Sequence, residues 1–93
     1  MDPRVVHEPD ESRYDLWVGD RLAGHIRYLR CADGVLVLAH TEIDPDLRRD
    51  GLGATLVRAA LDDARDRDLT VQPLCPFVAA FIRQHPEYDD LVA

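Results

Sequence analysis

The stretch "VLVLAHTEIDPDLRRDGLGATLVRAALDDARD", residues 35–66, decides the fold of this chain. It begins with an apolar run, residues 35–43, that is β-branched at intervals, as is typical of a strand covered on both faces. Further on, apolar residues recur at helical spacing and predict a helix over residues 52–68. These apolar positions are Leu52, Leu56, Val57, Ala60, Leu61 and Ala64. Between the strand and the helix lie two arginines and two glycines, in "DPDLRRDGLG", residues 44–53.

The sequence on either side of this stretch predicts a mixed sheet with helices packed on it. Residues 14–18 and 21–30 alternate polar and apolar positions around a glycine-aspartate turn, which indicates a β-hairpin. Residues 69–75 read as a further strand, and residues 76–85 as a second helix that Pro86 ends. The element order is therefore β-β-β-α-β-α. We expect the α/β (α+β) class, with a mostly antiparallel sheet, a parallel βαβ crossover and two packed helices.

Length, charge and cysteine usage narrow the classes of function. With 93 residues the chain fits a single domain, 1–93, of which we expect residues 1–12 to be flexible. The net charge of -7 argues against nucleic acid or an anionic membrane surface as a partner, and it is compatible with a basic or amine-bearing substrate. No apolar run approaches the roughly 20 residues of a membrane span, and the acidic start does not resemble a targeting signal. We therefore expect a cytoplasmic protein in which Cys31 and Cys75 are reduced thiols.

The junction at residues 44–53 has the chemistry of an anion site. The first N–H groups of a helix lack partners and the helix dipole is positive there, while Gly51 and Gly53 let the backbone approach a ligand closely. Arg48 and Arg49 add positive charge. The alternative is an ordinary tight turn with incidental arginines. A P-loop is excluded because Gly53 is not followed by Lys-Ser/Thr, and the dinucleotide fingerprint lacks its third glycine. What remains is the pattern Arg-x-x-Gly-x-Gly, met by Arg48, Gly51 and Gly53.

These residues resemble the Gcn5-related N-acetyltransferases, and within them a short, single-domain group. The resemblance spans residues 14–92 and is carried by "IDPDLRRDGLGATLVRAAL" and "PLCPFVAAFIRQHPEYDDLV". It implies transfer of an acetyl group from acetyl-CoA, as cosubstrate, to an amine. It also implies that backbone N–H groups of residues 49–54 hold the CoA pyrophosphate and that the strand ending at Ile43 pairs with the pantetheine arm. The implied cofactor-binding residues are Ile43, Arg48, Arg49, Asp50, Gly51, Leu52, Gly53 and Ala54.

Asp50 departs from the resemblance, because relatives often have a basic or small residue at its place in the loop. A carboxylate beside a pyrophosphate is repulsive at short range. We therefore expect Asp50→Gly to tighten acetyl-CoA binding, unless the carboxylate points away from the loop.

Three residues are candidates for the chemistry. His40 and Glu42 are two apart on a strand and so point to one face, and either could take a proton from the amine, which then attacks acetyl-CoA directly. Cys75 precedes a helix N-terminus, which lowers a thiol pKa, so it could instead take the acetyl group first and pass it on. The superfamily commonly uses a tyrosine near the second helix as general acid; Phe81 cannot fill that role. Each candidate also has a structural alternative: a buried thiol, a core histidine or a sheet carboxylate.

One metal-binding pattern is matched only in part. "HTE" and "PLCPFV" imitate the His-x-Glu and Pro-Cys-x-x-Cys pattern of zinc deaminases, but the second cysteine would fall at Val78, so we expect no metal.

The short N-terminal part leaves a shallow acceptor site that suits a protein lysine, a polyamine or a small amine, unless a partner subunit completes it. The alternative function is a module that binds or senses acyl-CoA with little turnover. The sequence leaves monomer and dimer open.

Overall fold

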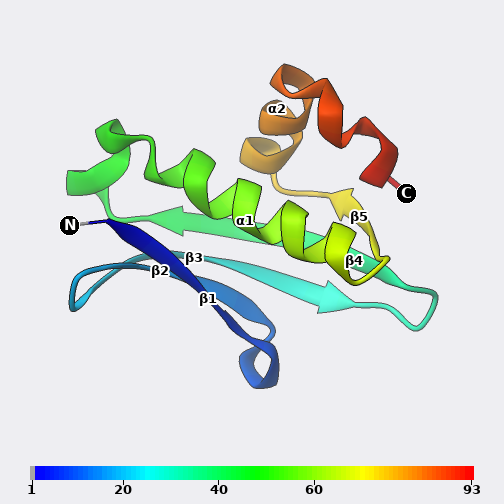
Figure 1. The fold of residues 1–93 in the computed structure, drawn as a ribbon, viewed down its shortest axis with the longest axis horizontal. Coiled ribbons are helices and arrows are strands. Elements are labelled where there is room, and N and C mark those ends of the chain that lie inside the picture. Colours follow the sequence, from blue (N-terminus) through cyan, green and yellow to red (C-terminus); the bar gives the residue numbers. More distant parts are fainter. Residues whose placement is uncertain (1) are drawn as a thin grey trace.

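The computed structural model describes residues 2–93, without the side chains of residues 48–50, and it has five strands in one sheet (Figure 1). The strands lie in the order β1-β2-β3-β4-β5, with antiparallel pairing up to β4 and parallel pairing between β4 and β5. Their bounds are Pro3–Glu8 for β1, Arg13–Val18 for β2, Arg21–Arg30 for β3, Val35–Ile43 for β4 and Thr70–Pro73 for β5. The hairpin, the central strand and the parallel crossover are confirmed.

Strand β1 corrects the expectation of a flexible segment at residues 1–12. Residues 3–8 pair along their whole length with β2 and form the edge of the sheet. A proline can occupy the first position of an edge strand because no ladder hydrogen bond depends on its nitrogen. The strand is tied down by His7, whose ring stacks on Tyr14 at 4.3 Å between centroids and whose Nε2 lies 2.6 Å from the hydroxyl of Tyr28. Tyr14 is the partner of His7 in the register of β1 and β2, whereas Tyr28 lies 21 residues away in the sequence, where no local pattern predicts the contact.

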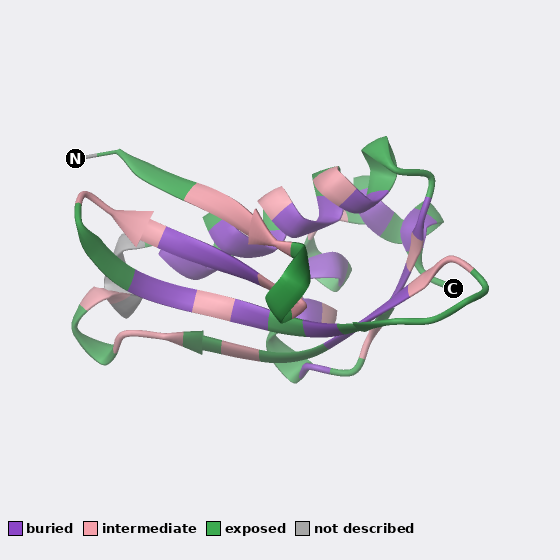
Figure 2. Cartoon of the chain, turned by 90° about the horizontal axis from the view of Figure 1, so that it is seen from below, coloured by how far each residue is buried: buried purple, intermediate pink, exposed green. Residues whose placement is uncertain are grey.

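The helices α1 (Leu52–Asp66) and α2 (Pro76–Gln84) lie over the same face of the sheet (Figure 1). Three short 3-10 segments, η1 (Pro9–Glu11), η2 (Pro45–Asp50) and η3 (Pro86–Leu91), connect or follow the main elements. The predicted apolar positions of α1 are all buried, together with Gly53. They pack on the inward side chains of β2, β3 and β4, such as Leu16, Ile26 and Leu38, none of which is exposed. Figure 2, seen from the opposite face of the sheet, shows that burial is concentrated in the middle of the central strands.

Helix α1 ends at Asp66, two residues before the predicted limit at residue 68. Asp68 adopts the left-handed conformation at φ 57°, its N–H donates to Arg65 O, and the N–H of Leu69 donates to Ala64 O. This is the hydrogen-bond pattern of a Schellman C-cap, with aspartate where glycine is usual. The turn sends the chain directly into β5.

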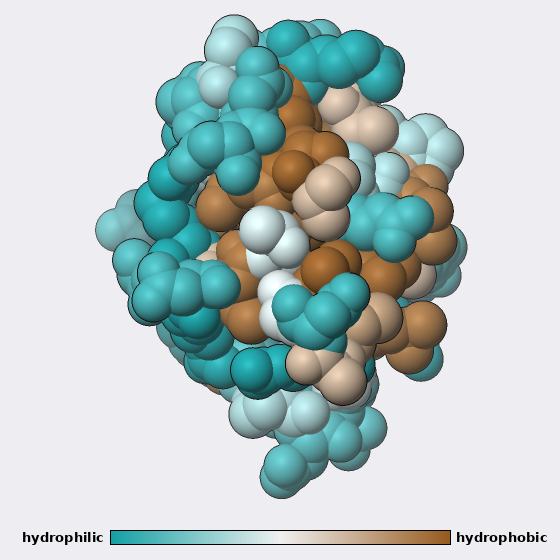
Figure 3. Space-filling model, turned by 90° about the vertical axis from the view of Figure 1, so that its right-hand side faces the viewer, coloured by the Kyte–Doolittle hydropathy of each residue, from teal (hydrophilic) through white to brown (hydrophobic). Residues whose placement is uncertain are grey.

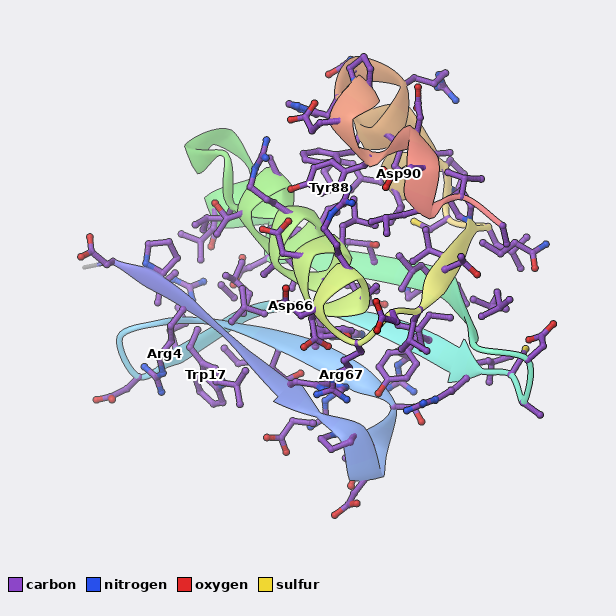
Figure 4. All side chains as sticks on the ribbon, turned by 45° about the vertical axis from the view of Figure 1, so that its right-hand side comes forward. Arg4, Trp17, Asp66, Arg67, Tyr88 and Asp90 are labelled. Carbon is purple, nitrogen blue, oxygen red and sulfur yellow. The ribbon has the colours of Figure 1, made fainter. Side chains whose placement is uncertain are left out.

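Segment η3 is held against α1 by polar contacts. The Tyr88 hydroxyl donates to Asp62 at 2.7 Å and accepts from Arg58 at 3.1 Å, and Arg65 makes two hydrogen bonds to Asp90. Figure 4 shows Tyr88 and Asp90 on the side of η3 that meets the helix. The end of the molecule that holds β5 and the C-terminus also carries an apolar area framed by hydrophilic side chains (Figure 3).

Candidate active site

The site begins where β4 and β5 separate. The two strands pair from Val35 to Leu38, and the N–H of Cys75 adds a last hydrogen bond to Leu38 O at 3.0 Å. Beyond this point β4 continues to Ile43, whereas the segment that follows β5 turns into α2. The gap between them opens into a pocket of about 430 Å³. Its lining residues are Thr41, Ile43, Gly51, Gly53, Ala54 and Phe77.

The glycine turn forms one wall of this pocket. Gly51 has φ 71°, a left-handed conformation that glycine adopts without strain, and an added Cβ would meet no atom within 4 Å. Its backbone leads from η2 into the first turn of α1, where unpaired N–H groups and the positive end of the dipole lie. The side chain of Leu52 is buried in the core, so only its backbone could take the predicted part in binding an anion. The predicted roles of the Arg48, Arg49 and Asp50 side chains lie outside the described part of the chain.

Gly53 lies against a side chain of the neighbouring helix α2. A Cβ on this residue would stand 2.6 Å from Cζ and 3.0 Å from Cε2 of Phe77, in the first turn of α2. Gly53 thus lets the Phe77 ring lie against the start of α1, where the ring becomes part of the pocket although it is 45% exposed. No pattern in the sequence predicts a role for Phe77. Only the approach of the two helices identifies it.

Cys75 lies at the opening of the gap, as the N-cap residue of α2. Its buried thiol donates a hydrogen bond to Thr41 Oγ1 at 3.4 Å. Burial raises the pKa of this thiol, but the Thr41 hydroxyl and backbone N–H groups, including those of Val78 and Phe77, favour the thiolate more strongly, so the pKa is lowered overall. A lowered thiol pKa increases the thiolate fraction at neutral pH.

An extra residue in β4 changes which way the second half of that strand faces. Tyr28 of β3 pairs with Leu38, and the preceding Arg27 pairs with His40, so Ala39 is inserted between the two pairs. This arrangement is a β-bulge, which bends a strand and redirects the side chains beyond it. Without it, the two-residue period of a strand would place His40 on the same face as Leu38.

The bulge separates the predicted catalytic residues into two groups. Thr41 pairs with fully buried Ile26 and faces the helices, together with the thiol of Cys75. His40 and Glu42 lie together on the opposite face, with His40 Nε2 at 2.9 Å from Glu42 Oε1. The structure therefore places His40 beside Glu42 on the outer face of β4, and Cys75 beside Thr41 on the face that meets the helices.

A second, more open pocket of about 340 Å³ lies beside Glu42. Its lining includes His25, Glu42 and Asp44, and it shares Ile43 with the first pocket. The hydrogen bond to His40, followed by the charge of His25, lowers the pKa of Glu42. His25 Nε2 is buried and lies 3.9 Å from Glu42 Oε2, which is beyond hydrogen-bond distance. This acidic pocket is open to the outer face of the sheet.

None of the three tyrosine hydroxyls is directed at the first pocket. Those of Tyr14 and Tyr88 donate to Asp63 and Asp62, nine or ten residues along α1 from Gly53. At 1.5 Å rise per residue this is about 14 Å from the glycine turn. Tyr28 is bonded to His7 at β1. No tyrosine is among the described residues that line the first pocket.

Two features of the described residues concern metal ions and membranes. Within residues 2–47 and 51–93, no three His, Cys, Asp or Glu side chains gather in a way that could hold a metal ion. In the same part of the chain, neither helix has the length and apolar character needed to span a membrane.

Comparison with known proteins identifies similar chains. The family of GCN5-related N-acetyl-transferases matches residues 13–91. No curated protein matches the chain. The NMR solution structure of a GCN5-like protein from Staphylococcus aureus is similar with a TM-score of 0.75 and 19% sequence identity, and the match covers 97% of this chain and 87% of that one. At this identity the likeness shows the fold alone, and it confirms the predicted fold class.

Proposed function

Because this chain belongs to the GCN5-related N-acetyl-transferases, we propose that it moves an acetyl group from acetyl-CoA to an amine acceptor. The observation that carries the proposal is the pocket where β4 leaves β5. A glycine turn at a helix N-terminus forms one end of it, and Thr41, in contact with a thiol whose pKa is lowered, forms the other. This arrangement suits a long ligand with an anionic end and a reactive acyl end.

In the proposed complex the CoA pyrophosphate lies on the backbone N–H groups of residues 49–54. The partial positive charge of the α1 N-terminus favours an anion there, and Arg48 and Arg49 add charge. The pantetheine arm follows β4 past Ile43 and lies against the Phe77 ring. The thioester then reaches the gap beside Cys75.

Two routes of transfer are open to the residues around this gap. In the first, the neutral amine attacks the thioester carbonyl carbon directly, the bond from that carbon to the CoA sulfur breaks, and the CoA thiolate takes up a proton. In the second, the Cys75 thiolate attacks and releases CoA, and the amine then attacks the new Cys75 thioester, which frees the Cys75 thiolate again. In both routes one proton leaves the amine and no oxidant or reductant is needed.

The pair of His40 and Glu42 would serve as the proton acceptor for the incoming amine. Glu42 lies 2.9 Å from His40 Nε2 and holds that nitrogen, which leaves Nδ1 as the free basic position when Nε2 carries the proton. Because this pair is on the outer face, the amine would approach from the side opposite the helices.

The acceptor would be a cationic amine, such as a protein lysine, a polyamine or a small primary amine. Glu42 lines a pocket at the surface, so its carboxylate can attract an ammonium group and release it after neutralisation, whereas Asp44 in the same pocket is already paired with Arg21. The net charge of -7 favours encounter with such acceptors.

A thiol-release assay with a panel of amines tests the proposal. We expect release of CoA above the rate of hydrolysis with at least one cationic amine, and loss of most of this release in His40→Ala. Saturable binding of acetyl-CoA with no amine-dependent release would instead favour a sensor of acyl-CoA. Incubation with acetyl-CoA followed by intact mass separates the two routes, because only the second gives an acetyl adduct, and full turnover by Cys75→Ala would exclude it.

A further inference from the structure

Thr41 is the residue that joins the proposed acetyl-CoA pocket to the thiol. Its side chain lines the pocket with Ile43 and Phe77, and its Oγ1 accepts the hydrogen bond of Cys75 at 3.4 Å. The β-bulge at Ala39 is what turns Thr41 toward this side of the strand. The contact is therefore produced by a specific departure from regular strand geometry.

A threonine hydroxyl can serve both states of a neighbouring thiol. It accepts from the S–H of Cys75, and after deprotonation it can rotate and donate its own proton to the thiolate. Hydrogen bonds to ionised groups are stronger than those between neutral groups, so the exchange favours the thiolate. Thr41 stands second, after burial, among the causes that set the pKa of this thiol, and it acts in the opposite sense to burial.

We propose that Thr41 is a positioning residue that holds the Cys75 sulfur next to the pocket and stabilises its thiolate through the threonine hydroxyl. The two-step route rests on the proposed function. In this route the same hydroxyl stabilises the Cys75 thiolate at two steps. It supports the thiolate before attack on acetyl-CoA, and it supports the thiolate released when the amine breaks the bond between the acetyl carbon and the Cys75 sulfur. Thr41 itself exchanges no bond with the substrate.

The rate of alkylation by iodoacetamide as a function of pH tests the inference without any transfer reaction. The exposed Cys31 is first replaced in Cys31→Ser, so that Cys75 is the single thiol. Three proteins are compared in this background: the parent, Thr41→Val and Thr41→Ser. Valine keeps the shape of threonine and lacks the hydroxyl, whereas serine keeps the hydroxyl. The midpoint of the pH profile is the readout, because the limiting rate also varies with the intrinsic nucleophilicity of the thiolate.

The ordinary pKa of a cysteine thiol is about 8.5, and we expect the midpoint of the parent's pH profile to lie below it. Loss of one hydrogen bond to an ionised group corresponds to a rise of about one pH unit in Thr41→Val, whereas Thr41→Ser keeps the parent midpoint. Equal midpoints in the parent and Thr41→Val would overturn the inference. So would a rise of the same size in Thr41→Ser, because packing and not the hydroxyl would then set the pKa.

Two further measurements keep these results interpretable. Circular dichroism and acetyl-CoA binding of each variant establish that the fold and the pocket are kept, and Thr41→Ala replaces Thr41→Val if valine disturbs either. The outcome is also separate from that of the proposed function. If no amine supports CoA release but Thr41→Val raises the alkylation midpoint, the transferase proposal fails and the role of Thr41 stands.

Discussion

The contact between Gly53 and Phe77 gives a quantitative prediction for Gly53→Ala. The added Cβ would stand 2.6 Å from Phe77 Cζ, a separation at which the ring must move. Phe77 as a residue is 45% exposed, so its ring can swing toward solvent without disturbing the core. Because Phe77 lines the pocket, this movement changes the surface on which we propose the pantetheine arm lies.

The effects on stability and on binding should differ. Alanine in place of glycine within a helix gains up to about 1 kcal/mol from propensity, which offsets the cost of moving an exposed ring, so the free energy of unfolding should change by less than about 1 kcal/mol. Removing a large part of the contact between a ligand and an aromatic ring should cost about 1.4 kcal/mol or more. This corresponds to a rise in the Kd for acetyl-CoA of about tenfold or more.

A double-mutant cycle with Phe77→Ala identifies the cause. Isothermal calorimetry gives the Kd for acetyl-CoA in the parent, the two single variants and the double variant, and urea unfolding gives their stabilities. Without the ring, the new Cβ meets no side chain of Phe77, so Gly53→Ala should have little further effect on Kd in the Phe77→Ala background. If Gly53→Ala weakens binding by the same factor in both backgrounds, the methyl group obstructs the pocket itself and the explanation through Phe77 is refuted.

Three other predictions concern the glycine turn at Gly51, the contact of Tyr88 with α1, and His7 in β1. Gly51→Ala should lower the free energy of unfolding by about 1–2 kcal/mol, since φ is 71°, while Gly51→Asn should cost less, as urea titrations can measure. Tyr88→Phe should cost about 1–2 kcal/mol through loss of the hydrogen bond to Asp62 and should leave the calorimetric Kd for acetyl-CoA unchanged. Burial, followed by the Arg67 cation, lowers the pKa of His7, so on acidification the unfolded chain binds the proton first. Stability should therefore fall as pH drops below about 6.5, and this fall should be smaller in His7→Asn; identical pH profiles would contradict the assignment.

The elements that sequence reasoning found are those whose signal is local. Helix α1 follows from the spacing of its apolar residues, which are buried as predicted, and α2 from the prolines at residues 76 and 86. Strand β1 was missed because it has a proline at its start and another just after its end, which are signals of a loop. What holds it is the set of contacts from His7 to Tyr28 and Arg67, which lie 21 and 60 residues away in the sequence.

In the candidate site, too, only features with a local sequence signal could be predicted. The glycine turn could be located from sequence because a left-handed residue and a helix start have recognisable residue types. The bulge at Ala39 could not, since an inserted alanine in an apolar strand has no distinctive signature. The sequence predicts that His40 and Glu42 share a face of β4, but it does not show that Cys75 lies on the other face of that strand. The parts played by Thr41 and Phe77 depend on the packing of segments distant in sequence.

The central claim is that acetyl-CoA occupies the pocket between β4, the glycine turn and the start of α2. Titration of the ¹⁵N-labelled protein with acetyl-CoA, followed through backbone amide shifts, tests it most directly. We predict that the largest shifts fall on the amides of Gly51, Gly53 and Ala54 and on those of Thr41 and Phe77. Saturable binding whose shifts cluster elsewhere, for example around Arg4 and Trp17 on the opposite face of the sheet (Figure 4), would contradict the account.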